Sequence, residues 1–171
     1  MNRNIVFLLL LTLVGCNKDR KIVEKLSLDW NYDYSSEIIH ATLIKNEVSY
    51  SNADACEVNY SVFEVIESFK GAYDIGDHFK AIGILAHETH YEGSQHLLML
   101  KPFKANEFPG YGNCLNETYS DYLTVHNWCC SIDSSKPSSL IVYDMLNSET
   151  KGENYLYPTP PIFDYLRKRG K

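Results

Sequence analysis

The segment 57–69 constrains the fold more than any other part of the sequence. Apolar side chains occupy its even-numbered positions up to Val62 and mainly its odd-numbered positions from Phe63 onward. A strand cannot move its apolar residues by one position without turning them to the other face of the sheet, unless a β-bulge absorbs an extra residue. A bulge near Val62–Phe63 would bend the strand, so the pattern favours a strand that curls around a small barrel. The alternative is a strand buried on both faces.

Four segments in this part of the chain have the composition of β-strands, because they are rich in Ile, Val, Phe and Tyr and are bounded by Asn, Asp or Gly. They are residues 37–49, 57–69, 77–85 and 95–101. Beyond Phe103 the signal weakens. Residues 116–128 are compatible with a short helix or an edge strand, and Leu140–Tyr143 is the expected fifth strand.

The last residues predict a helix. Thr159 is a residue type that caps helices, and the two prolines after it suit the first helical positions. The predicted fold class is therefore mainly β, a small five-stranded barrel with a C-terminal helix and an irregular extension. Residues 37–171 are expected to form a single β-rich domain, with the barrel core at 37–103 and the extension with its helix at 104–171.

Residues 1–16 have the pattern of an export signal. Arg3 provides a positive start, and the apolar run 5–14 is about half of the ~20 residues that a membrane-spanning helix needs. The run ends in Leu13-Val14-Gly15-Cys16, which resembles the lipobox of bacterial lipoproteins. The resemblance implies cleavage before Cys16 and lipid attachment to its thiol, with an ordinary signal and a chance cysteine as the alternative.

A lipid at Cys16 would anchor the chain in the cell membrane or the outer membrane, on the exported side of the inner membrane. Residues 17–36 are then expected to form a tether. Removal of the signal takes away Arg3 and no acidic residue, so the mature net charge changes from −6 to −7. This acidic balance argues against a nucleic-acid partner. The basic cluster Arg167–Arg169 with Lys171 is compatible with a helix C-terminus or with contact to anionic lipid headgroups.

Four cysteines remain when the lipidated one is set aside. They are Cys56, Cys114, Cys129 and Cys130. An even number of cysteines in an exported chain predicts two disulfides, for which three connectivities exist. Free thiols and a metal site are the alternatives, although adjacent Cys129 and Cys130 lack the two-residue spacing typical of zinc ligands.

The strands also carry a family resemblance, in residues 38–44, in residues 60–71 ending in Lys70-Gly71, in the Gly76-Asp77 turn and in the closing strand 97–103. This order resembles the netrin-like, or tissue-inhibitor-of-metalloproteinase-like, modules of secreted bacterial proteins. The resemblance implies a five-stranded barrel of the oligonucleotide/oligosaccharide-binding (OB) type. It does not transfer protease inhibition, since Cys16 would be lipidated and no Cys-x-Cys pattern is present. It therefore implies a fold rather than an activity.

Three histidines lie close together in the sequence, at His87, His90 and His96. The first two are too close for the His-Glu-x-x-His pattern of helical metalloproteases, so this region is compatible with a solvated loop or with a weak metal site. No cofactor is expected. The sequence favours a membrane-anchored binding or interaction module of the cell envelope with an unknown ligand, which would contact its partner through loops such as 86–94. A metal-dependent enzyme that uses the His87 and His90 loop is the alternative.

Overall fold

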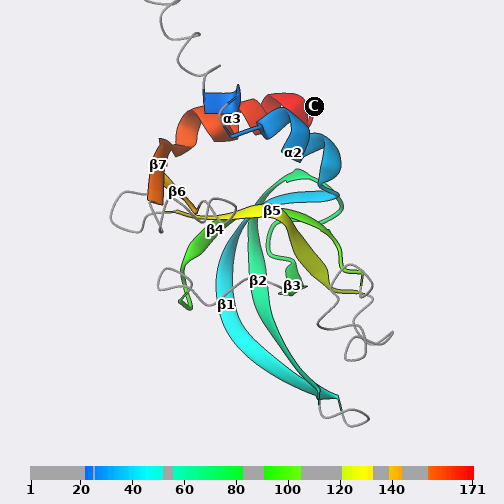
Figure 1. Cartoon of the computed structure of the whole chain (residues 1–171). Coiled ribbons are helices and arrows are strands. Elements are labelled where there is room, and N and C mark those ends of the chain that lie inside the picture. Colours follow the sequence, from blue (N-terminus) through cyan, green and yellow to red (C-terminus); the bar gives the residue numbers. More distant parts are fainter. Residues whose placement is uncertain are drawn as a thin grey trace, which may run out of the picture.

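The computed structural model describes residues 22–24, 26–51, 56–82, 91–104, 121–132, 139–143 and 154–171. Its principal elements are α2 (Leu28–Tyr34), β1 (Glu37–Ser51), β2 (Cys56–Lys70), β3 (His78–Ile82), β4 (Gln95–Pro102), β5 (Leu123–Ile132), β6 (Ser139–Tyr143), β7 (Asn154–Pro158) and α3 (Thr159–Arg169). Figure 1 shows the strands as a curled sheet, with α2 and α3 together at one end.

Five of the strands close into a ring. β1 pairs with β2 and β4, β2 pairs with β3, and β4 pairs with β5. The ring is completed where Ala81 and Ile82 of β3 run parallel to Leu123 and Thr124 of β5. The prediction of a mainly β chain built on a small five-stranded OB-like barrel with a C-terminal helix is confirmed.

The predicted fifth barrel strand was wrong. Leu140–Tyr143 belongs to β6, which pairs with the end of β5 and with β7 outside the ring. The barrel is closed by β5, which the sequence left ambiguous because His126, Asn127 and two cysteines interrupt its apolar residues. β5 forms a strand because β4 and β3 each offer an edge with which it can pair, and such tertiary pairing overrides weak local preference.

The irregular apolar pattern of β2 is explained by burial on both of its faces. The β1–β2 register shifts opposite Val62 and Phe63, as expected, but the extra residue is Ile44 of β1. β2 itself pairs with β3 without interruption, and the consecutive residues Ser61, Val62 and Phe63 are all buried, so both faces of the strand are covered there. Phe63 packs in the barrel core, whereas Val58 packs in a separate cluster on the outer side. Burial of β2 on both faces therefore explains why its apolar residues change from even-numbered to odd-numbered positions. The bulge lies in β1 and adds curvature to that strand.

The apolar residues form two main clusters. The interior of the barrel contains side chains such as Phe63, Phe79, Leu98 and Leu100. The second cluster lies between the strands and the two helices, and its helical members include Leu28 of α2 with Ile162, Phe163 and Leu166 of α3. The helices therefore cover apolar strand residues that would otherwise face water.

Several described residues of the segment expected as a tether, residues 17–36, pack against the core. Ile22 and Val23 pack against the core cluster, and Leu26 and Leu28 are buried in it. Buried Asn31 donates its side-chain amide to the carbonyl oxygens of Leu26 and Ser27, at 3.1 and 3.2 Å, and so fixes the turn that leads into α2. Ile22 and Val23 therefore belong to the folded body.

The start of α3 differs slightly from the expected cap. Pro158 occupies the N-cap position, Thr159 is the first helical residue, and no side chain caps the helix. Thr159 is buried and its hydroxyl finds no hydrogen-bond partner within the described residues. Among those residues, no helix is long and apolar enough to cross a membrane.

Candidate functional site

The outer surface of β2 and β3 gathers an aromatic and charged cluster around Lys80. The ammonium of Lys80 lies 5.4 Å from the ring centroid of Tyr60 and 5.1 Å from that of Tyr122. Its Nζ also donates to the Tyr122 hydroxyl at 3.3 Å. The two rings meet edge to face with centroids 5.2 Å apart. Because an ammonium is attracted to the face of an aromatic ring, these three side chains hold one another in place. We call them the Lys80 cluster.

A carboxylate from β1 borders this cluster. Glu47 accepts hydrogen bonds from the Tyr60 hydroxyl and the Lys45 ammonium. The Lys45 hydrogen bond is the larger cause that lowers the pKa of Glu47, and the Tyr60 hydrogen bond adds to it. The same contact with Glu47 raises the pKa of Tyr60. Tyr60 therefore stays protonated at neutral pH and presents a fixed ring.

The fold places these residues together by non-local pairing. Tyr60 pairs with Ile82, and Lys80 lies two residues before Ile82 on the same face of β3. Tyr122 arrives from the segment before β5, where its carbonyl oxygen accepts a 2.8 Å hydrogen bond from the backbone N–H of Phe103. Buried Val58, Ile82 and Phe103 form the apolar support beneath the two tyrosines.

This surface has the chemistry of a binding site. Half-buried Tyr60 and Tyr122 offer aromatic surface, Lys80 is an exposed cation, and Glu47 is an acceptor at the border. Barrels of the OB type bind their ligands over the face of strands 2 and 3 and through the loops between strands 1 and 2 and strands 4 and 5. The Lys80 cluster occupies this position on the barrel, and Tyr122 stands at the end of the β4–β5 connection.

His96, the third of the candidate histidines, lies inside the barrel. Its side chain is fully buried, with its ring edge toward Phe63 at a centroid distance of 5.8 Å. Nε2 shares a 2.7 Å hydrogen bond with the Ser94 hydroxyl, and Nδ1 lies 3.4 Å from the Ser131 hydroxyl. These contacts satisfy a polar group in the core and give His96 a structural role.

The other candidate ligands are placed only in part. Cys129 and Cys130 stand on β5 opposite Leu98 and Leu97, and Cys56 stands at the start of β2 opposite Ser51. The remaining candidates, Cys16, Cys114, His87 and His90, lie outside the described residues, as do residues 86–90 of the expected contact loop. Within the described part of the chain, no three His, Cys, Asp or Glu side chains are grouped to hold a metal ion.

The basic residues at the end of α3 divide into two pairs. Arg167 and Arg169 form ion pairs within the protein, whereas Lys168 and Lys171 are exposed. Arg167 donates to both carboxylate oxygens of Glu67 on β2, at 2.7 and 2.8 Å. This bidentate contact is the main cause that lowers the pKa of Glu67.

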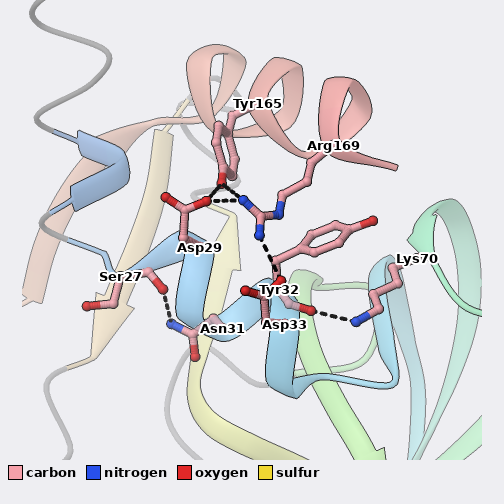
Figure 2. Close-up of polar contacts among 8 residues, drawn as sticks. All are labelled: Ser27, Asp29, Asn31, Tyr32, Asp33, Lys70, Tyr165 and Arg169. Carbon is pink, nitrogen blue, oxygen red and sulfur yellow. Dashed lines mark hydrogen bonds and ion pairs between the residues drawn. The ribbon is translucent and has the colours of Figure 1, made fainter. Parts of the chain in front are cut away.

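Arg169 joins the two helices, as Figure 2 shows. It donates to Asp33 of α2 at 2.7 Å and also contacts Asp29 and the hydroxyl of Tyr165. Burial and a hydrogen bond to Asp29 raise the pKa of Tyr165 to about 12. In the same view, the Lys70 ammonium donates to the backbone oxygen of Tyr32 at 2.6 Å and so joins β2 to α2.

No protein-family model and no curated protein matches this chain.

Sequence reasoning named neither Tyr60 nor Tyr122 as a site residue. Thirteen tyrosines are present, and most strand tyrosines simply fit half-buried positions. The signal that could have pointed to this surface is Lys80, a charged residue between two apolar positions of a short strand. Its neighbours could not be identified, because Tyr122 is 42 residues away and approaches through ring closure.

Proposed function

We propose that the chain is a lipid-anchored binding module of the cell envelope, which contacts its partner through the Lys80 cluster. The observation that carries the proposal is the position of these three side chains on the face of strands 2 and 3, where OB-type barrels bind. The netrin-like resemblance and the lipobox at Cys16 support the same reading.

A binding role fits the chemistry of the cluster better than a catalytic one. Lys80 is exposed and its ammonium is directed to two tyrosine rings, and the nearby carboxylate of Glu47 is engaged by Lys45 and Tyr60. No described nucleophile lies beside an activating base there. Fixed aromatic rings and charged groups instead supply contact area at low cost in conformational entropy.

Crosslinking in the intact cell tests the proposal. A benzoylphenylalanine at Tyr122 replaces one aromatic residue by another at the cluster, and the same residue at exposed Leu156 of β7 serves as the matched control. We expect a specific adduct from position 122 and none from position 156. The substitution Lys80→Ala should weaken formation of that adduct, because it removes the cation from both rings.

Two results would contradict the proposal. Equal adducts from positions 122 and 156 would show that the Lys80 cluster has no special role. Stoichiometric zinc in the purified protein, lost in the His87→Ala/His90→Ala variant together with a hydrolytic activity, would favour the metal-dependent enzyme.

A further inference from the structure

α2 exposes two aromatic rings on the side that points away from the core. Trp30 is 45% exposed and Tyr34 is 62% exposed, and their ring centroids lie 4.8 Å apart. The buried residues of this helix are instead Leu28 and Asn31. Trp and Tyr are enriched where proteins meet the headgroup region of a bilayer, because each combines an apolar ring with a polar group.

Charge is distributed unevenly between the helices and the barrel. Among the described residues, 22–24, 26–34 and 159–171 at the helical end carry four basic and four acidic side chains, a net charge of zero. The described residues between 35 and 158 carry five basic and nine acidic side chains, a net charge of −4. An anionic surface would therefore repel the barrel more than the helical end, where Lys168 and Lys171 are exposed.

The length of the leader determines how far this end can lie from the lipid. Ile22 already packs against the core beside α2 and α3. Six residue steps separate Cys16 from Ile22, which span at most about 20 Å even when fully extended. A lipid at Cys16 consequently keeps the helical end close to the bilayer, while β1 and β2 extend away from that end (Figure 1).

We propose that α2 and α3 form a membrane-contacting face, in which Trp30 and Tyr34 enter the headgroup region and Lys168 and Lys171 bind the phosphates of anionic lipids. The proposal rests on the lipid-anchored function proposed above. Arg167 and Arg169 are held in ion pairs and maintain the face rather than bind lipid. The bilayer contact orients the barrel, so that its β1–β2 hairpin points away from the membrane.

Tryptophan fluorescence tests the aromatic part of this face. The chain contains two tryptophans, so Trp128→Phe leaves Trp30 as the only one. The lipidated protein is reconstituted into phosphatidylcholine vesicles with and without phosphatidylglycerol, using lipids brominated along their acyl chains. We expect a blue shift and quenching of Trp30 in the anionic vesicles. A lipidated protein that floats with these vesicles while Trp30 stays unquenched would overturn the proposal.

Vesicle binding without the lipid tests the face independently. The mature chain with Cys16→Ser is mixed with phosphatidylglycerol vesicles at low salt, where electrostatic attraction is weakly screened. Replacement of Lys168 and Lys171 by Gln should weaken binding by about fivefold for each lysine. Lys45→Gln with Lys104→Gln removes the same charge from the barrel and should weaken binding far less. Equal losses in the two double variants would contradict an oriented face.

A second pair of variants separates insertion from charge. Trp30→Gln with Tyr34→Gln should weaken vesicle binding and leave the fold intact, because both rings are exposed. Val48→Gln with Tyr91→Gln removes two exposed apolar side chains from the barrel as the control. Failure of fatty-acid labelling in the cell would refute the anchor alone, because the vesicle measurements on the Cys16→Ser protein do not depend on it. Crosslinking of residue 30 to an envelope protein, with no lipid quenching, would assign this face to a protein partner.

Discussion

Arg167 of α3 and Glu67 of β2 form a bidentate ion pair between residues that are 100 positions apart in the chain. The Arg167 guanidinium also lies 5.9 and 5.7 Å from the ring centroids of Phe69 and Phe163. One side chain thus joins the polar border of α3 to the aromatic residues beneath it. The contact explains how the C-terminal helix is held in register against β2.

A double-mutant cycle measures this ion pair. We expect Arg167→Gln and Glu67→Gln to be coupled by about 0.5–1 kcal/mol in the free energy of unfolding, since both side chains are partly exposed and surface pairs contribute little. Urea denaturation of the two single variants and the double variant gives the value. Strictly additive effects would show that the pair contributes nothing to stability.

Leu166→Ala should destabilise the protein much more. Leu166 is fully buried between α3 and the strands, and removal of a buried leucine side chain costs about 2–5 kcal/mol. Lys168→Ala, two positions later on the exposed side, should change the unfolding free energy by less than about 0.5 kcal/mol. Similar melting temperatures for the two variants would mean that α3 is not part of the cooperative core.

Stability should decrease as the solution is acidified. Burial lowers the pKa of His40 from its usual value of 6.5, while a hydrogen bond to Gln95 partly opposes this effect. The unfolded chain therefore binds a proton before the folded chain does, so the contribution of His40 is complete above about pH 6.5 and is lost as the pH falls through its folded pKa. At pH values below the ordinary pKa of Glu, protonation of Glu67 causes a second loss of stability, because Arg167 lowers the pKa of Glu67 in the folded protein.

Thermal melts between pH 7.5 and 5 test the first of these two losses. We expect His40→Gln to melt with a weaker pH dependence than the parent protein in this range. Gln preserves an amide at the position of the Gln95 contact and cannot titrate. Parallel curves for the two proteins would assign the pH dependence to other groups.

The register of the barrel restricts the disulfides that can form. Cys129 and Cys130 stand beside the part of β4 that pairs with Ile39 and His40, whereas Cys56 pairs with Ser51 at the far end of β1. About twelve residues of β1 separate these positions, roughly 40 Å along the strand at about 3.3 Å per residue. Disulfides need Cα atoms within about 7 Å. We therefore expect no bridge from Cys56 to Cys129 or Cys130 in a non-reducing peptide map, and such a bridge would contradict the register.

Cys16→Ala should abolish lipid attachment. No other group in the leader can form the thioether, so the uncleaved precursor should accumulate in the cell. Metabolic labelling with a radioactive fatty acid measures this directly, and the Cys56→Ala variant is the control because it should label normally. Processed and labelled Cys16→Ala protein would refute the lipobox.

The sequence predicted the elements whose patterns are local. β1, β2 and β4 are long runs of strand-forming residues, and the prolines at 160 and 161 marked the start of α3 within one residue. β5 was left ambiguous between a helix and an edge strand, because its partners, rather than its composition, make it a strand. β7 was missed for the same reason: it exists by pairing with β6.

The candidate site was less predictable than the fold. The cluster of histidines suggested a site because His87, His90 and His96 are close in sequence, yet His96 belongs to the core. Tyr60, Lys80 and Tyr122 come from three separate parts of the chain and meet only after the barrel closes. Local spacing carries no information on such an arrangement.

The parallel contact between β3 and β5 has a consequence for the order in which the molecule can be assembled. A chain that emerges from its N-terminus presents β1 to β4 first, and these strands leave the β3 edge and the far side of β4 unpaired. Neither edge is paired until residues 123–132 have been synthesised. The ion pairs of Asp29 and Asp33 form later still, after Arg169 has been synthesised. Contacts of such long sequence separation slow folding, because the entropy of loop closure is lost before the contacts form. The barrel of a nascent chain therefore stays open until β5 has been synthesised, and α2 and α3 can pack together only after α3 has been synthesised.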